Sequence, residues 1–413
     1  MSSGVKFEPT VAEILSKVRE GETITREEAL VLGEVEGEEF SSLLKAARDL
    51  ADRHKGKTIS YSRKVFIPLT NLCRDYCGYC TFRRDPGDVG AKTMAPDEVL
   101  EVVHRGAELG CKEALFSLGD RPEALFAEAR DELGRLGFRR TLDYLAAVCR
   151  LVTERSPLLP HANPGLLGPR DLRMLREVNV SLGLMLESVS PRLQEAGGAH
   201  ENAPDKLPSR RLRTLEEAGH LNIPFTTGIL IGIGETWTER VDSLLAIARL
   251  QRQYGHIQEV IIQNFRAKPA IPMCDVPDPT LEDFLRTIAV ARLILGGEMN
   301  LQAPPNLTPD NYPSLVSSGI NDWGGISPLT QDYINPEAPW PHLRELYERT
   351  AACGYQVRER LAIYPEYITR KQVYLDPVLW PNVERLCGQD GYAKEESAWA
   401  VESQRGGRDA RVV

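Results

Sequence analysis

Three cysteines lie close together in the chain, at Cys73, Cys77 and Cys80. The spacing C-x3-C-x2-C puts three thiolates on one short loop, where they can converge on a single metal centre. A structural zinc site takes a fourth ligand, usually from a second Cys or His pair, and no such pair lies nearby in the sequence. An iron–sulfur cluster held by three protein thiolates leaves one iron open to a non-protein ligand. The residues therefore favour such a cluster over structural zinc or a chance grouping.

The other five cysteines are scattered, which is not the pattern of a disulfide framework in a small chain. We expect them to be buried thiols of the hydrophobic core without a chemical role. They are Cys111, Cys149, Cys274, Cys353 and Cys387.

The elements that must position the cluster are short apolar runs that alternate with amphipathic helical stretches from about residue 60 onward. This alternation predicts parallel βαβ units, and eight such units close a (β/α)8 barrel of the TIM type. A doubly wound sheet is less favoured, because no glycine-rich nucleotide motif follows the first strand. We expect strands at 65–69, 114–118, 158–162, 180–186, 225–231, 259–263, 300–303 and 316–320, with helices at 96–109, 141–154, 171–177, 209–218, 238–253 and 281–295.

The chain divides into three parts on this interpretation. Residues 1–58 form a helical N-terminal extension, in which Thr25 and Glu28 frame a capping box that opens a helix. Residues 59–330 form the barrel, and residues 331–413 form a C-terminal extension that ends in a frayed tail.

Composition limits the classes of function. The 413 residues include 59 acidic and 50 Lys and Arg residues, a formal charge of −9, so general binding to nucleic acid or to an anionic membrane is not expected. No run of about 18 apolar residues predicts a transmembrane helix. The first residues lack the apolar segment of a secretory signal, and we expect a cytoplasmic protein.

The C-x3-C-x2-C loop after a first barrel strand resembles that of the radical S-adenosylmethionine (SAM) enzymes. The resemblance implies that Cys73, Cys77 and Cys80 hold a [4Fe–4S] cluster whose fourth iron is chelated by the methionine end of SAM. One electron from the reduced cluster would then cleave SAM into methionine and a 5′-deoxyadenosyl radical.

The same resemblance assigns further SAM contacts at the ends of later strands. Tyr79 matches the aromatic position beside adenine, and Gly119 with Asp120 matches the turn that meets the methionine amino group, where glutamate is the more usual acid. Glu187 matches the polar group at the ribose or methionine end. The fifth-strand motif along adenine would comprise Gly228, Gly232 and Glu235.

Four longer segments narrow the resemblance to the CofG type of 7,8-didemethyl-8-hydroxy-5-deazariboflavin (FO) synthase, over about residues 55–370. The Asn-Asp-Trp-Gly-Gly run is more typical of this type than of its partner, the CofH type. The segments are 61–73, 263–269, 303–307 and 319–328.

This resemblance implies a radical lyase and cyclase of deazaflavin coenzyme biosynthesis. Its small-molecule substrate would be the 4-hydroxybenzyl adduct of 5-amino-6-ribitylaminouracil, which it cyclises oxidatively with loss of ammonia. The implied partners are a CofH-type subunit, or its diffusible product, and a one-electron donor such as flavodoxin or ferredoxin.

Polar residues that follow the predicted strands suit such a substrate, because uncharged amides match a pyrimidinedione and a ribityl chain. Trp323 could stack on the hydroxybenzyl ring or pack in the core. For His161 and Asn163, substrate contact and a structural role are equally open. Asp322 and Glu187 are the candidate general bases. The expected substrate contacts are Gln263, Asn264, Arg266, Lys268, Asn306, Asn321, Asp322 and Trp323.

Two other functions remain possible from the sequence. The first is the CofH-type transfer of a 4-hydroxybenzyl group from tyrosine to 5-amino-6-ribitylaminouracil, on the same fold with the same cofactor. The second is a non-catalytic zinc or electron-transfer protein, although an electron-transfer protein would normally hold its cluster with four protein ligands.

Overall fold

Eight parallel strands close into a barrel in the computed structural model, which describes residues 9–394. The strands follow one another around the barrel in chain order, and β1 closes the ring by pairing with both β2 and β8. The (β/α)8 fold predicted from the alternating pattern is therefore confirmed. The strands are β1 Thr58–Pro68, β2 Glu113–Ser117, β3 Leu159–Asn163, β4 Ser181–Gly183, β5 Phe225–Ile231, β6 Ile257–Asn264, β7 Leu301–Gln302 and β8 Asp322–Ile326.

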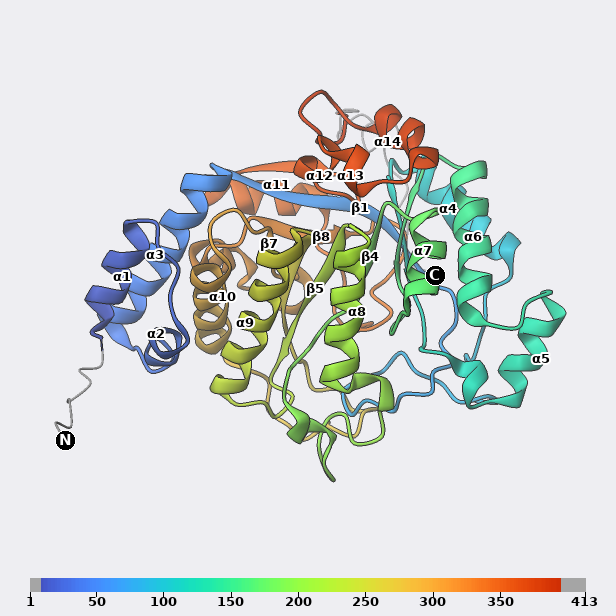
Figure 1. Ribbon diagram of the computed structural model, residues 1–413, viewed down its shortest axis with the longest axis horizontal. Helices are drawn as coiled ribbons and strands as arrows, with labels where there is room; N and C mark the ends of the chain where they lie inside the picture. Colours follow the sequence, from blue (N-terminus) through green and yellow to red (C-terminus); the bar gives the residue numbers. More distant parts are fainter. Residues whose placement is uncertain (1–8, 395–413) are drawn as a thin grey trace.

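The helices between the strands surround the barrel (Figure 1). Their starts carry the expected chemistry: the Thr236 and Thr280 side chains cap helices, and Pro96 stands in the first turn of another. These helices are α4 Pro96–Glu108, α5 Ala127–Arg135, α6 Thr141–Arg155, α7 Pro169–Arg176, α8 Pro208–His220, α9 Trp237–Tyr254 and α10 Leu281–Leu295. Short 3-10 turns are η1 Pro122–Ala124, η2 Pro191–Gln194, η3 Pro204–Lys206, η4 Pro305–Leu307, η5 Tyr312–Ser318 and η6 Pro377–Leu379.

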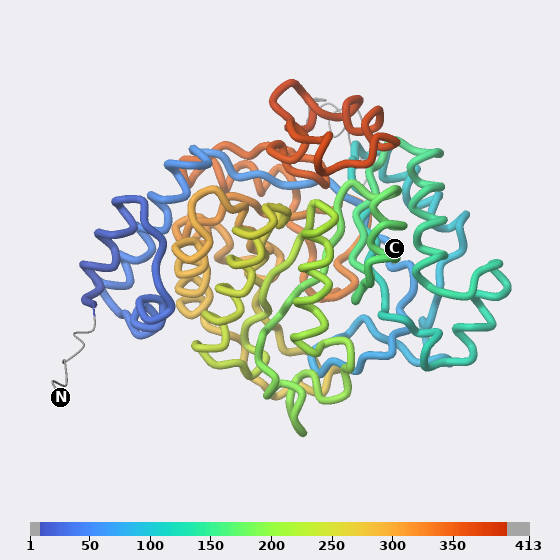
Figure 2. The backbone as a smooth tube through the Cα atoms, in the orientation of Figure 1, coloured from blue at the N-terminus to red at the C-terminus, as the bar shows by residue number. Residues whose placement is uncertain are grey.

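Three helices precede the barrel and lie against its outer wall beside α9 and α10 (Figure 2). They are α1 Val11–Arg19, α2 Arg26–Val31 and α3 Gly37–Lys55. The predicted capping box is present, because Thr25 accepts from the Glu28 backbone and Glu28 accepts from the Thr25 backbone at 2.6 Å. Arg26 reaches Asp242 on α9 with two hydrogen bonds, so this extension is held to the barrel by charge as well as by packing.

The C-terminal segment returns to the amino-terminal end of the barrel. Its strand β9, Gln356–Arg360, pairs with residues 58–62 of β1, while β2 pairs with residues 64–68. In Figure 1 the part of this segment from β9 onward lies at the opposite end of the molecule from the loop after β1. Its helices are α11 Leu343–Ala352, α12 Pro365–Ile368, α13 Lys371–Tyr374 and α14 Trp380–Leu386. The tail expected to fray lies largely in residues 395–413, outside the described residues.

Buried charges close the amino-terminal end of the barrel. The Arg360 guanidinium, 4% exposed, donates to both Asp322 oxygens at 2.7 and 2.9 Å and to Glu259 at 2.9 Å. The Tyr364 hydroxyl donates to the same Glu259 oxygen at 2.9 Å. Because Asp322 belongs to β8 and Glu259 to β6, the ion pairs join strands that β7 separates.

The eighth strand is displaced from its predicted position. Residues 316–320 lie at and after the 3-10 turn η5, because the Arg48 guanidinium binds the carbonyls of Val316 and Ile320 and Gly319 adopts a φ of 96°. The strand instead begins at Asp322, which pairs with Ser60 and Gln302. The expectation that residues 321 and 322 follow a strand at the loop end is therefore wrong, since they lie where the strand begins.

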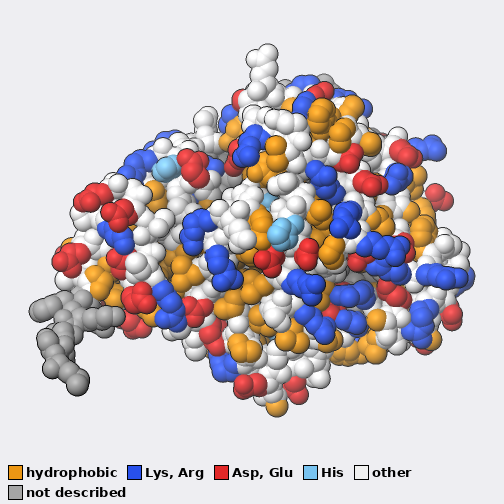
Figure 3. Space-filling model, viewed as in Figure 1, with side chains coloured by type: hydrophobic (Ala, Val, Ile, Leu, Met, Phe, Trp, Pro, Cys, Tyr) orange, Lys and Arg blue, Asp and Glu red, His pale blue; other side chains and the backbone are white. Residues whose placement is uncertain are grey.

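The face of the molecule shown in Figure 3 carries acidic and basic side chains side by side. Among the described residues, no helix combines the length and the apolar character needed to cross a bilayer.

Replacing Asp322 with alanine should destabilise the protein by about 3–5 kcal/mol, because Arg360 would lose its bidentate partner in a buried site. The measurement is urea unfolding followed by tryptophan fluorescence. The matched control is Asp49→Ala, which removes an exposed partner of Lys45 and should cost less than about 1 kcal/mol. Equal losses in the two variants would contradict a structural role for Asp322.

Candidate active site

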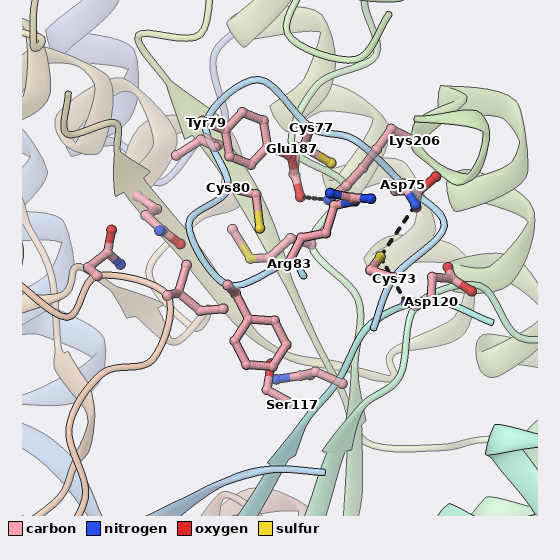
Figure 4. A pocket seen from close by; sticks show the side chains of 18 of the residues that line it. Cys73, Asp75, Cys77, Tyr79, Cys80, Arg83, Ser117, Asp120, Glu187 and Lys206 are labelled. Carbon is pink, nitrogen blue, oxygen red and sulfur yellow. Dashed lines mark hydrogen bonds and ion pairs between the residues drawn. The ribbon is translucent and has the colours of Figure 1, made fainter. Parts of the chain in front are cut away.

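The loop after β1 brings the three cysteines to one cavity at the carboxyl ends of the strands (Figure 4). Cys73, Cys77 and Cys80 are free thiols, and all three line this cavity of about 310 Å³. The Cys73 Sγ accepts backbone N–H groups from Asp75 at 3.4 Å and Asp120 at 3.2 Å. Burial raises the pKa of Cys73 to about 12, so its thiolate needs a positive partner such as iron. The donor set suits a cluster with one open iron.

The turn after β2 packs closely against the cysteine loop and bonds to its backbone. The Gly119 N–H donates to the Thr70 carbonyl at 2.9 Å, and the Arg74 N–H donates to the Asp120 carbonyl at 3.2 Å. A Cβ atom at Gly119 would overlap the Leu72 carbonyl and lie 2.7 Å from the Cys73 Cβ. This approach of two backbones requires glycine at residue 119.

Glu187 lies at the centre of the polar side of the cavity. Its backbone is left-handed, with φ of 65°, and bridges to Ile229 on β5. Its carboxylate accepts from Lys206, from the Tyr79 hydroxyl and from His200 at 3.3 Å. Burial alone would raise the pKa of Glu187, but Lys206, His200 and Arg211 hold it well below its usual range. The carboxylate is therefore ionised and a weak base, which argues against the predicted role as general base.

Two positively charged side chains of the cavity were not predicted from the sequence. Lys206 and Arg211 line it from η3 and α8, and Arg211 also lies 3.8 Å from the Glu187 carboxylate. Arg211 is fixed by donating to the Met185 carbonyl at 2.7 Å. These cations could hold a small-molecule carboxylate, such as that of a methionine group. The only available signal was a basic run at the start of the predicted helix 209–218.

Three buried carboxyls gather beside the cysteine loop. Asp75, Asp120 and Asp205 lie with oxygen atoms within 4.8 Å of one another. Arg74 donates to Asp205 at 2.5 Å, and Arg121 donates to Asp120 at 2.9 Å. Burial raises the pKa of Asp75 to about 6 and also raises that of Asp120. Asp120 further accepts the Leu166 N–H at 3.0 Å, so its oxygens already have partners within the protein.

The predicted SAM contacts divide into two sets. Tyr79, Gly119, Asp120 and Glu187 line the cavity. The fifth-strand residues do not: a Cβ at Gly228 would overlap the Ile261 carbonyl on β6, and Gly232 is a turn glycine with φ of 89°. The Glu235 carboxylate accepts the Gly232 and Ile233 N–H groups at 2.9 Å each, and Arg240 at 2.6 Å.

The predicted substrate contacts on and after β6 reach the cavity, and those of β7 and β8 do not. Asn306 donates to Asp332 and to the Ala338 carbonyl at 3.1 Å each, and so fixes the C-terminal segment. Asn321 accepts from Arg292 at 2.9 Å at the opposite end of the barrel. Trp323 is buried and donates to Thr350 at 3.1 Å. The residues that line the cavity are Gln263, Asn264, Arg266 and Lys268.

A segment after β8 forms another wall of the cavity. Ile334 and Asn335 line it. The Thr81 hydroxyl donates to the Ile334 carbonyl at 2.6 Å, and Lys268 donates to Asn335 at 2.6 Å. The C-terminal extension therefore contributes to the site itself, which the sequence patterns did not reveal.

Comparison with known proteins identifies the family. Residues 67–247 match the radical SAM superfamily. The 7,8-didemethyl-8-hydroxy-5-deazariboflavin synthase of Methanopyrus kandleri is 51% identical over 336 residues, which are 81% of this chain and all of that protein. The chain belongs to this deazaflavin synthase family. It is therefore a radical SAM enzyme, of a superfamily that uses a [4Fe–4S] cluster and SAM.

Other deazaflavin synthases are longer. The FO synthase of Mycobacterium tuberculosis is 50% identical over 390 residues, which are 91% of this chain but 46% of that protein. The chain thus spans about half the length of these relatives. Among solved structures, the hydrogenase maturase HydG superposes with a TM-score of 0.71 at 18% identity, over 97% of this chain and 94% of that one. Methylornithine synthase superposes with a TM-score of 0.64 at 18% identity, over 83% and 97%. These two structures support the fold alone.

Substituting Gly119 with alanine should displace the cysteine loop, because the added Cβ meets backbone atoms of Leu72 that cannot rotate away. We expect the affinity for the cluster to fall about 10-fold, seen as less iron and sulfide per chain after anaerobic reconstitution. Gly134→Ala in α5 is the matched control, since its Cβ would meet nothing within 4 Å. Full occupancy in the Gly119 variant would contradict the close contact.

The Glu187→Gln variant should respond less to acid than the parent protein. Because the pKa of Glu187 is lowered in the folded state, its carboxylate stabilises the fold above the ordinary Glu pKa of about 4.3. That contribution is lost as pH falls through the lower, folded-state pKa. The difference in unfolding free energy between the two proteins should be largest at pH 7 and shrink toward pH 3. A constant difference across this range would show that the pKa of Glu187 is not lowered in the fold.

Proposed function

We propose that this chain performs the CofG-type step of deazaflavin synthesis. It would convert 5-amino-5-(4-hydroxybenzyl)-6-(D-ribitylimino)-5,6-dihydrouracil into FO, with ammonia, 5′-deoxyadenosine and methionine as co-products. The observation that carries the proposal is the match, over 81% of this chain and the whole length of the relative, to a synthase named for the deazariboflavin product itself. The cavity agrees, since it combines three free cysteines with uncharged amides on one wall.

In this proposal Cys73, Cys77 and Cys80 hold the cluster, and the surrounding residues bind SAM. When bound, the reduced cluster and SAM supply a 5′-deoxyadenosyl radical that removes hydrogen from the adduct. Lys206 and Arg211 offer positive charge to the methionine carboxylate. Glu187 keeps these cations and Tyr79 in place, and its left-handed backbone turns the carboxylate toward them.

The remaining walls bind and shield the adduct. Gln263 and Asn264 offer amide donors and acceptors to the pyrimidinedione and ribityl groups. The 334–335 segment, held by Thr81 and Lys268, keeps water away from the reacting carbons. The electron would come from a flavodoxin or ferredoxin, and the adduct from a CofH-type subunit or its released product.

The CofG and CofH reactions share a fold and a cofactor, so substrate decides between them. Anaerobic protein with reductant and SAM should convert the adduct into fluorescent FO and release 5′-deoxyadenosine. Tyrosine and 5-amino-6-ribitylaminouracil supplied instead should give no adduct. Formation of the adduct from these two would contradict the assignment.

Cys77→Ala should reduce both FO and 5′-deoxyadenosine to background, because the cluster would lose one of its three protein ligands. Both products are measured by chromatography of the same reaction. Cys353→Ala is the matched control, since Cys353 is exposed and does not line the cavity. If Cys77→Ala kept its activity and the Cys353→Ala control lost it, the proposed role of the cysteine loop would be wrong.

A further inference from the structure

A line of hydrogen bonds runs from the cavity wall toward the amino-terminal end of the barrel. Asn163, the last residue of β3, lines the cavity. Its amide Oδ1 lies 3.3 Å from the His161 Nε2. The His161 Nδ1 lies 2.6 Å from the Ser181 Oγ on β4, and this hydroxyl donates to the Ala362 carbonyl at 2.6 Å. His161 and Ser181 are both buried.

The last contact in this line fixes the tautomer of His161. A carbonyl oxygen only accepts hydrogen bonds, so the single hydroxyl proton of Ser181 points to Ala362. The Ser181 oxygen must then accept from the imidazole, which places a proton on the His161 Nδ1. Burial lowers the pKa of His161, so the ring is neutral and its Nε2 carries a lone pair.

That lone pair fixes the orientation of the Asn163 amide. The oxygen and nitrogen of an amide are told apart by their hydrogen bonds, because their shapes are nearly the same. The structure places the Asn163 Oδ1 3.3 Å from the His161 Nε2. Two acceptors cannot bond to each other, so we assign the amide in its turned orientation, with the NH₂ group toward His161 Nε2. The Asn163 carbonyl oxygen then takes the other direction, where the amide has no hydrogen bond to any described residue. Gly183 leaves the space for this arrangement, because a Cβ there would overlap the Asn163 amide.

We propose that Asn163 is a specificity-determining residue that presents a fixed hydrogen-bond acceptor to an N–H or O–H group of the substrate. His161 and Ser181 are positioning residues that stop the amide from turning over. The inference rests on the proposed function, in which the substrate carries a pyrimidinedione with imide N–H donors. A fixed acceptor rejects a ligand that covers it but lacks the matching donor, because the acceptor would be left unpaired.

Gln263 on β6 shows the contrast. It also lines the cavity, and its amide makes no hydrogen bond to another described residue. It can therefore turn to offer either its donor or its acceptor, whereas Asn163 offers only the acceptor. The discrimination between a ring N–H and an N-methylated ring should therefore depend on Asn163.

The tautomer is tested first, without substrate. Protein labelled with ¹⁵N-histidine should show one neutral ring protonated at Nδ1, assigned to His161 by its absence from His161→Gln. Ser181→Ala should shift this signal toward the tautomer protonated at Nε2. A His161 that is protonated at Nε2 in the parent protein would overturn the inference, whatever the protein's substrate.

The second test compares substrate KM with SAM affinity. Asn163→Ala should raise the KM for the adduct about 5–10-fold, the effect of one hydrogen bond, and leave SAM binding unchanged. The parent protein should reject an adduct methylated on the imide nitrogen, and the variant should lose this preference. Asn179→Ala is the matched control, a buried amide that bonds to the Leu175 carbonyl away from the cavity.

The outcomes separate this inference from the proposed function. If the parent protein converts no adduct, the proposed function is refuted. The tautomer of His161, which is measured without substrate, would still test the hydrogen bonds from Ser181 to Asn163. A parent protein that forms FO, with Asn163→Ala equal to it in KM and in preference, would refute the role of Asn163 alone. A change in SAM affinity instead of adduct KM would also refute it.

Discussion

The cavity depends on one buried carboxylate that several separate segments share. Glu187 follows β4 and bridges to β5, yet its oxygens accept from Tyr79 on the cysteine loop and from His200 and Lys206 beyond η2. Three positively polarised partners around one charge offset the cost of burying it, which a single partner would not do. The left-handed backbone at residue 187 is tolerated because this network holds it. Without the carboxylate, the cysteine loop and the cations would have no common anchor.

A second buried ionic group performs the corresponding task at the other end of the barrel. Barrel interiors are usually filled by branched apolar residues, but here Arg360 joins Asp322 and Glu259 across the interior. The side chain that supplies the positive charge comes from β9, outside the eight-stranded ring. The C-terminal segment therefore completes the barrel at one end through Arg360 and walls the cavity at the other through Ile334 and Asn335.

The sequence predicted those parts of the structure that depend on local patterns. The three cysteines and the glycine turn at Gly119 could be found because close spacing and backbone contact leave a mark in a short segment. The start of β8 could not, since the apolar run 316–320 looks like a strand until Arg48, far away in α3, binds its carbonyls. Because of this one error, Asp322 was predicted to lie in the active site, whereas it lies inside the barrel. Lys206 and Arg211 were missed because they reach the cavity from outside the strand ends.

The polar groups of the cavity form a charged set and an uncharged set, and the two sets suit different ligands. Beside Glu187 the cations Lys206 and Arg211 are paired with its carboxylate, so they favour a charged ligand that can exchange with those pairs. On the walls made by β3 and β6 the groups are uncharged amides that a neutral ring can satisfy without an ionic partner. A charged cofactor and a neutral heterocycle can therefore occupy one cavity without competing for the same groups. The hydrogen-bond line behind Asn163 adds direction to the uncharged wall, because it ties the orientation of one amide to the buried interior.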